Sequence, residues 1–253
     1  MMKNKKFINA VIGIGILIGV WCLLSTLGQA GKSSVPSPYK VALAIKEMID
    51  DKILFQYIGI SLYRFFVGYI ASVIVAVLLG LLLGYFSKVW DVIDPIVQIL
   101  RPISPTAWFP FIVIAFGIGN LPAIVIIFLS SFYTVLISTV TAVKKIDEMY
   151  LKVCDTFEIR GLSLITKVVF PAIFPSIANA MHIALGSAWI FLVAGEMVGA
   201  QSGLGYLIID ARNNLRNDML LAGIVLIGVI GLILDKLIGL FERKINSKWG
   251  RFV

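Results

Sequence analysis

Long apolar stretches separated by short polar segments dominate the pattern of this chain. A helix needs about 20 mostly apolar residues to cross the hydrocarbon core of a bilayer. The windows that approach or reach this length are residues 7–27, 61–84, 105–119, 121–143, 172–198 and 219–241. The pattern therefore predicts an all-α, polytopic membrane protein with about six transmembrane helices, or five if the shortest window does not cross.

The window at residues 105–119 is the shortest and the weakest of these. Pro102, Pro105 and Pro110 stand at its start. Because proline removes a backbone donor and kinks or breaks a helix, we expect this span to begin with a kink.

Two polar segments interrupt the apolar pattern. Residues 29–56 begin with turn formers and continue as a mixed-charge amphipathic helix, which we expect on the extracytoplasmic membrane surface. Residues 144–171 are charged but repeat apolar side chains every three to four positions, as a helix on a surface does. The repeat consists of Ile146, Met149, Tyr150, Val153, Phe157, Leu162 and Ile165. A solvated connector would not need these side chains, so we favour contact with another protein at the cytoplasmic face.

Composition and charge agree with a membrane protein. Of the 253 residues, 59% are hydrophobic and 14% are charged, against about 25% charged in soluble domains. With both termini in the cytoplasm, 15 of the 22 Lys and Arg residues lie inside, Arg101 among them, which the positive-inside rule favours. The net charge of +8 thus reflects topology, and no soluble domain remains to bind nucleic acid.

Glu196 is a carboxylate deep in the fifth apolar window. A charge at membrane depth costs about 2.5 to 3.5 kcal/mol on insertion scales, so it normally faces protein or a wet cavity. Helical spacing puts His182 and Trp189 on the same face, which makes the three residues candidates for a translocation path. We favour a structural anchor for Glu196, capped by amides around Gly195 and Gly199. For His182 we favour an interhelical donor over a metal ligand.

A second polar stripe lies in the fourth window. Ser130, Thr134 and Ser138 share one helix face, which is suited to a hydrated path. Such residues also bond their own backbone carbonyls or allow close helix packing, and the two interpretations stay equally open. Arg64, at the start of the second window, is expected to reach the lipid headgroups.

Four segments form a jointly specific set of motifs. They read QILRPISPTAWFPFIVIAFGIG at 98–119, VVFPAIFPSI at 168–177, ALGSAWIFLVAGEMVGAQSGLGYLI at 184–208 and LLAGIVLIGVIGLILDKLIGLFERK at 220–244. Through them the chain resembles the permease subunits of binding-protein-dependent ATP-binding-cassette (ABC) importers of the nitrate, sulfonate, taurine and bicarbonate type. The resemblance implies a type I importer permease fold, with an N-terminal part at 1–56, a permease domain at 57–245 and a coupling loop at 144–171.

The same resemblance implies partners and a location. The permease pairs with a second copy as a homodimer, binds an ABC ATPase subunit that holds ATP and magnesium, and receives a sulfonate- or nitrate-like anion from an extracytoplasmic substrate-binding protein. It lies among the lipids of the inner or plasma membrane of a bacterial cell, with both termini cytoplasmic. The chain shows no nucleophile, metal cluster or acid–base pair, so we expect no enzyme, no catalytic residue and no bound cofactor or metal.

In this family the cytoplasmic loop carries the pattern E-A-A, three residues, G, nine residues, I-x-L-P, and forms the coupling helix. Aligning 168–171 with I-x-L-P places residues 152–154 at E-A-A and Glu158 at the glycine. Gly161 fits the glycine instead if Asp155 is the acid, but Pro171 then arrives three residues early. The implied ATPase contacts are Tyr150, Lys152, Val153, Cys154, Asp155, Phe157, Glu158, Gly161 and Pro171.

Two other classes of membrane protein stay open. A secondary transporter works without ATP and usually shows an internal repeat or paired charges within the membrane, and the sequence shows neither. A membrane scaffold that has lost transport would explain the divergent coupling loop. Copurification of an ATPase discriminates among the three classes.

Overall fold

The computed structural model describes residues 2–29 and 35–249, and side chains at 12–26, 35–245 and 247. These residues are almost wholly helical and contain no strand, so the predicted all-α membrane fold is confirmed. Residues 30–34 of the predicted outer segment lie outside the described part. In chain order the elements are α1 Met2–Gln29, α2 Pro38–Asp50, α3 Ile53–Tyr85, α4 Ser87–Leu100, the 3₁₀ helix η1 Pro105–Trp108, α5 Phe109–Phe116, α6 Asn120–Lys144, α7 Glu148–Thr156, α8 Gly161–Leu164, the π-helical turn η2 Ile165–Val169, α9 Phe170–Gly199, α10 Leu204–Asn213 and α11 Asn217–Trp249.

Four helical stretches within the described residues are long and apolar enough to cross a membrane. They are α3, α6, α11 and the continuous stretch of α8, η2 and α9. A fifth span exists only if α4 and the η1–α5 segment are counted together, because these two are bent by 84° at their break. The described apolar part of α1, Ile12–Thr26, is shorter than a full span.

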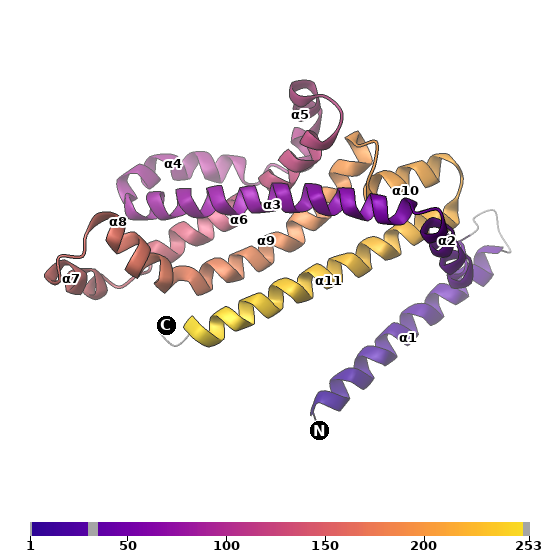
Figure 1. Ribbon diagram of the computed structural model, residues 1–253, viewed down its shortest axis with the longest axis horizontal. Helices are drawn as coiled ribbons and strands as arrows, with labels where there is room; N and C mark the ends of the chain where they lie inside the picture. The colour runs from indigo at the N-terminus through magenta and orange to yellow at the C-terminus, as the bar shows by residue number, and fades with distance from the viewer. Residues whose placement is uncertain (1, 30–34, 250–253) are drawn as a thin grey trace.

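The prediction of a separate span at 105–119 is wrong. Pro105 begins the one-turn η1, and α5 is only eight residues long. The prolines produce the expected kink, but the break is so sharp that α5 leaves the bundle at an angle (Figure 1).

Helices α3, α6 and α9 form the centre of the bundle, and α10 and α11 lie against α9 (Figure 1). Small residues let α3 approach α6 closely. A Cβ atom at Gly68 would lie 2.7 Å from the carbonyl oxygen of Ile124, and one at Gly80 would lie 2.6 Å from Cβ of Thr139. Close approach of backbones through small residues is the usual basis of helix packing in membranes.

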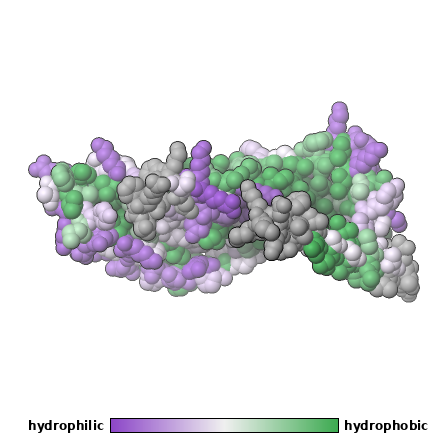
Figure 2. Space-filling model, turned by 90° about the horizontal axis from the view of Figure 1, so that it is seen from below, coloured by the Kyte–Doolittle hydropathy of each residue, from purple (hydrophilic) through white to green (hydrophobic). Residues whose placement is uncertain are grey.

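The two ends of the bundle differ in character. Helices α7 and α8 lie at one end, and α2 and α10 at the other (Figure 1). Figure 2 shows apolar residues over much of one face, with polar residues gathered toward the α7–α8 end and again at the α2 end. Only 6% of the most apolar stretch of α11 is buried within the chain, as expected for a helix that faces lipid.

Helix α2 is amphipathic and occupies the predicted surface segment. Its buried face, Val41, Ala44 and Met48, packs against α11. Arg216 joins the two elements, because its Nη2 lies 2.8 Å from Glu47 of α2 and 3.0 Å from an oxygen of Asp218 at the start of α11.

We expect Gly68→Ala to destabilise the bundle. The added methyl group meets the backbone of α6, which cannot move aside without separating the helices, and overpacking of this kind costs about 1 to 3 kcal/mol. Gly59→Ala, on the same helix, is the matched control because nothing lies within 4 Å of its Cβ position. Thermal unfolding in detergent measures both variants, and an equal loss of stability in the two would contradict this packing.

Candidate functional site

A buried ion pair joins Arg64 of α3 to Glu196 of α9. Arg64 Nη1 lies 2.8 Å from Glu196 Oε1, and the two side chains are 1% and 0% exposed. The expectation that Arg64 reaches the headgroups is therefore wrong. The sequence also predicted no paired charges within the membrane, whereas the structure pairs two residues that are 132 positions apart.

The carboxylate of Glu196 has donors on both of its oxygens. The hydroxyl of Ser61 lies 2.8 Å from each oxygen, and the amide of Gly205 donates to Oε2 at 2.9 Å. Ser61 in turn accepts a hydrogen bond from the amide of Leu204 at 2.8 Å. Because Gly205 and Leu204 belong to the first turn of α10, these bonds hold the start of that helix against α9.

The guanidinium of Arg64 also donates hydrogen bonds to two further residues. Its Nε donates to Oδ1 of Asn120 at 2.9 Å, and Nη1 and Nη2 donate to the carbonyl and hydroxyl oxygens of Ser202 at 2.6 and 3.0 Å. Asn120 begins α6, and Ser202 lies in the segment between α9 and α10. The ion pair therefore ties α3, α6, α9, α10 and the α9–α10 connection together.

A glycine at position 203 leaves space for this network. Gly203 has a φ of 105°, and a Cβ atom there would lie 2.7 Å from Oε2 of Glu196. The contacts favour the anchor interpretation of Glu196 over a path lining, although the capping amide is that of Gly205 and not those near Gly195 and Gly199.

The other two path candidates on α9 contact α11. The Nδ1 and Nε2 atoms of His182 lie 2.5 and 3.0 Å from carboxylate oxygens of Glu242 and Asp235, and the indole of Trp189 donates to the Ile227 carbonyl at 3.2 Å. His182 thus makes an interhelical contact of the kind predicted. Neither His182 nor Trp189 belongs to the lining of the cavity described next.

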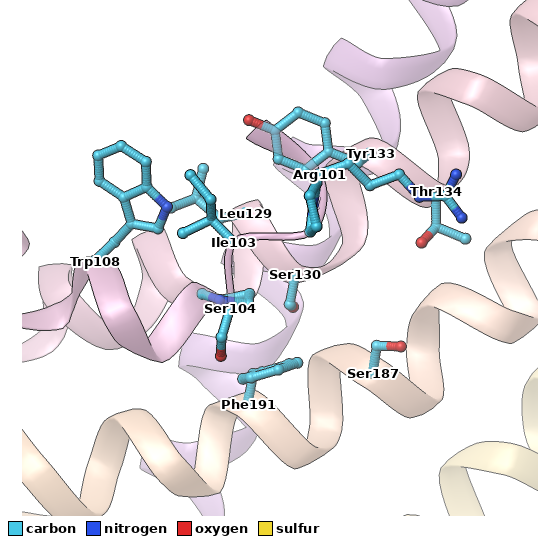
Figure 3. A pocket seen from close by; sticks show the side chains of 12 residues that line it. Arg101, Ile103, Ser104, Trp108, Leu129, Ser130, Tyr133, Thr134, Ser187 and Phe191 are labelled. Atoms are coloured by element: carbon cyan, nitrogen blue, oxygen red, sulfur yellow. The ribbon is translucent and has the colours of Figure 1, made fainter. Parts of the chain in front are cut away.

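A cavity of about 260 Å³ lies between the α4–η1 break, α6 and α9 (Figure 3). The break contributes Arg101, Pro102, Ile103, Ser104, Pro105 and Trp108, α6 contributes Leu129, Ser130, Tyr133 and Thr134, and α9 contributes Ser187 and Phe191. Of the stripe predicted on α6, Ser130 and Thr134 line the cavity and Ser138 does not. Ser130 also donates to the carbonyl of Ile127 at 2.8 Å, as a serine that bonds its own helix does, and the role of the stripe in a hydrated path stays a prediction.

Arg101 is the charged residue in this lining. The sequence pattern put it among the basic residues on the cytoplasmic side, whereas in the structure it caps the C-terminus of α4, which runs back along the bundle (Figure 1). Its neighbours across the cavity, Ser130 and Thr134, lie in the middle turns of α6. The prolines that follow Arg101 were the sequence signal for this break.

The loop at 144–171 folds into two short helices. Asp147 caps α7 by accepting a hydrogen bond from the Met149 amide at 2.8 Å. Tyr150 and Phe157 are exposed, whereas Cys154 is buried between the loop and the bundle. Two ion pairs lie on its surface, Lys152 with Glu148 at 3.8 Å and Asp155 with Arg160 at 2.7 Å.

Glu158 ends α7 in a left-handed conformation, with a φ of 58°. The amide of Ile159 donates to the Cys154 carbonyl at 2.9 Å and that of Glu158 to the Asp155 carbonyl at 3.0 Å, which is the Schellman arrangement that favours glycine at this position. Gly161, the alternative glycine, has a φ of 61° at the start of α8. Both positions thus adopt a left-handed conformation, which glycine adopts most easily. Pro171 follows the π-helical turn as the second residue of α9.

Comparison with known proteins gives a consistent result. The family described as binding-protein-dependent transport system inner membrane component matches residues 72–247. A protein of Bacillus subtilis named as an aliphatic sulfonates transport permease, SsuC, is 32% identical over 98% of this chain and 89% of its own length. The nitrate import permease protein NrtB of Leptolyngbya laminosa is 31% identical over 95% and 88%. A solved structure of the MetNI methionine ABC transporter, in an inward-facing conformation, shares the fold with a TM-score of 0.60 at 20% identity, over 77% of this chain and 94% of that one.

We expect Glu196→Gln or Arg64→Met to cost about 3 to 5 kcal/mol of stability, because each leaves a buried charge without its partner. Combining Glu196→Gln with Arg64→Met should cost less than the sum of the two single changes. Asp155→Asn, in an exposed pair, is the control and should cost about 0 to 1 kcal/mol. Unfolding in detergent gives these values, and additive single effects would refute the coupling.

We expect Glu158→Gly to stabilise α7, because glycine relieves a left-handed conformation that costs other residues about 1 to 2 kcal/mol. Amide hydrogen exchange in α7 should slow by about fivefold, the factor that corresponds to roughly 1 kcal/mol. Glu158→Gln removes the charge but keeps the side chain, so it should give no such gain. An equal gain in both variants would mean that charge, and not backbone conformation, is the cause.

Proposed function

This chain belongs to the family of binding-protein-dependent transport system inner membrane components, and on that premise we propose that it is the permease subunit through which an ATP-driven importer moves its solute. ATP and magnesium bind to a separate ATPase subunit, and an extracytoplasmic binding protein delivers the solute. The permease itself supplies the membrane path and transmits the movement of the ATPase.

The observation that carries this proposal is the exposed apolar surface on the α7–α8 loop. Met149, Tyr150, Val153, Phe157 and Leu162 are all exposed there, at one end of the bundle. Apolar patches that face water usually mark contacts with another protein. Four of these five residues, all but Leu162, lie outside the four spanning stretches, so a helix that crosses the bilayer does not account for them.

The charge of this loop favours an ATPase partner whose groove carries a complementary charge. Lys152 stands where the family pattern has glutamate, and its contact with Glu148 is exposed and therefore weak. We propose that the groove of the ATPase partner has a correspondingly altered charge. Such a partner would be specific for this permease.

The remaining surfaces suit the other subunits of an importer. The end with α2 and α10 lies opposite the α7–α8 loop and is the surface we assign to the binding protein (Figure 1). The face with α5 and the cavity is the surface we assign to a second copy of this chain, which would close the path. Both termini are then cytoplasmic, and the solute is an oxoanion of the sulfonate or nitrate kind that SsuC and NrtB are named for.

A membrane scaffold is the second candidate. It is favoured by Glu158, whose side chain occupies a backbone position suited to glycine in the loop that would transmit movement. A scaffold would bind the ATPase without stimulating hydrolysis. Family membership gives no support to a secondary transporter that works without ATP.

We expect the permease to copurify with its ATPase and to support ATP hydrolysis after reconstitution with the binding protein. Phe157→Asp should abolish copurification, because it places a charge in the apolar contact. Tyr39→Asp, an equally exposed position on α2, is the control and should leave copurification unchanged.

Hydrolysis that appears only after Glu158→Gly would favour the scaffold. Copurification of Phe157→Asp at the wild-type level would contradict the assignment of the ATPase surface.

A further inference from the structure

We propose that the cavity at the α4–η1 break binds a small organic oxoanion, such as an alkyl sulfonate, with Arg101 as the residue that recognises its charged group. The inference rests on the proposed function in one respect, because it places this site on the path that the solute follows. It goes further in naming the chemistry that the permease itself selects, independently of the binding protein.

Arg64 and Arg101 differ in their counter-charges. Arg64 is buried and neutralised by Glu196. The side chain of Arg101 makes no hydrogen bond or ion pair with any residue in the described part of the chain, and the cavity lining contains no carboxylate. A cation at the depth of the middle turns of α6 is costly without a counter-charge and usually marks a solute or ion pathway. A negatively charged solute would supply that counter-charge.

Hydroxyl groups surround the same space. Those of Tyr133, Thr134 and Ser187 have no hydrogen-bond partner among the described residues, so they are free to donate. Figure 3 shows Arg101 beside Tyr133 and Thr134, with Ser187 contributed from the neighbouring helix. A guanidinium offers two parallel donors that match two oxygens of an oxoanion, and the hydroxyl groups can donate a hydrogen bond to its third oxygen.

The opposite part of the lining is apolar. Ile103, Trp108, Leu129 and Phe191 provide a surface without donors or acceptors suited to an anion, apart from the indole N–H. Pockets for drug-sized ligands usually measure about 300 to 1,000 Å³, so a cavity of about 260 Å³ suits a smaller solute. A solute with a charged head and a short hydrocarbon part uses both sides of this lining, whereas nitrate would leave the apolar side uncovered.

Binding to the purified permease tests the site directly. Ethanesulfonate is the probe, ethanesulfonamide is its neutral counterpart, and sodium chloride at equal ionic strength is the salt control. We expect ethanesulfonate to give a saturable rise in the thermal unfolding temperature that ethanesulfonamide and chloride do not give, since a ligand that binds only the folded state stabilises it. Nitrate should give a smaller rise than ethanesulfonate.

Variants then assign the binding to Arg101. Arg101→Gln should weaken the apparent affinity for ethanesulfonate by about tenfold or more, as expected for the loss of a charged hydrogen bond. Arg101→Lys keeps the positive charge but loses the two parallel donors of the guanidinium, so its affinity for ethanesulfonate should lie between those of wild type and Arg101→Gln. Arg243→Gln, at an exposed position on α11 whose side chain makes no hydrogen bond or ion pair among the described residues, is the matched control. Equal responses of wild type and Arg101→Gln, or no response of the wild type, would overturn the proposal.

Uptake into liposomes separates this proposal from the proposed function. In the complete importer, Arg101→Gln should lower uptake of the sulfonate while ATP hydrolysis persists. A wild-type complex that neither hydrolyses ATP nor takes up any solute would contradict the importer function, and the binding measurement on the permease would still decide the site. Loss of sulfonate binding without loss of sulfonate uptake would place the site off the path and overturn the inference.

Discussion

A buried carboxylate and a buried guanidinium must neutralise each other, and the arrangement of one end of this bundle follows from that requirement. Removing Arg64 and Glu196 from water costs several kcal/mol for each ion, which their mutual attraction offsets only if the remaining donors and acceptors are also satisfied. Those further contacts come from Ser61, Asn120, Ser202 and the first turn of α10. The pair therefore holds three spanning helices and a connecting segment in one arrangement, and a shift of any of them would leave a charge unsatisfied.

The same physical rule explains why Arg101 is a different kind of residue. The α4–η1 break brings its side chain beside α6 without a carboxylate in the cavity lining. Proline residues produce that break, because they cannot continue the hydrogen bonding of α4 into a straight span. One arginine is thus part of the scaffold and the other faces a cavity, and their partners distinguish them where their residue type does not.

Sequence alone was sufficient for the spanning helices and for the loop, because both depend on local periodicity. The apolar windows correspond to α3, α6, α9 and α11, and the three-to-four spacing of apolar side chains in the loop corresponds to α7 and the turns after it. The prediction of a separate span at 105–119 was wrong because hydropathy does not measure how sharply a proline-rich break bends the chain.

The site was harder to predict because its contacts are distant in sequence. Nothing local to Arg64 reveals that Glu196 lies beside it, so reaching the headgroups was the natural expectation for a residue near a helix start. Helical spacing correctly put His182, Trp189 and Glu196 on one face, but it could not tell whether that face met a cavity or α10 and α11. Ser130 and Thr134 line the cavity only because the break between α4 and η1 leaves space beside α6.

Whether the solute passes through this cavity is tested most directly by the accessibility of a cysteine placed in it. Ser187→Cys, in a chain whose Cys22 and Cys154 have been replaced, would be treated in reconstituted importer with a thiol reagent that cannot cross the membrane. We expect labelling from the extracytoplasmic side when ATP closes the ATPase, and from the cytoplasmic side without nucleotide. Labelling from the same side in both states, or from neither side, would contradict a path through this cavity.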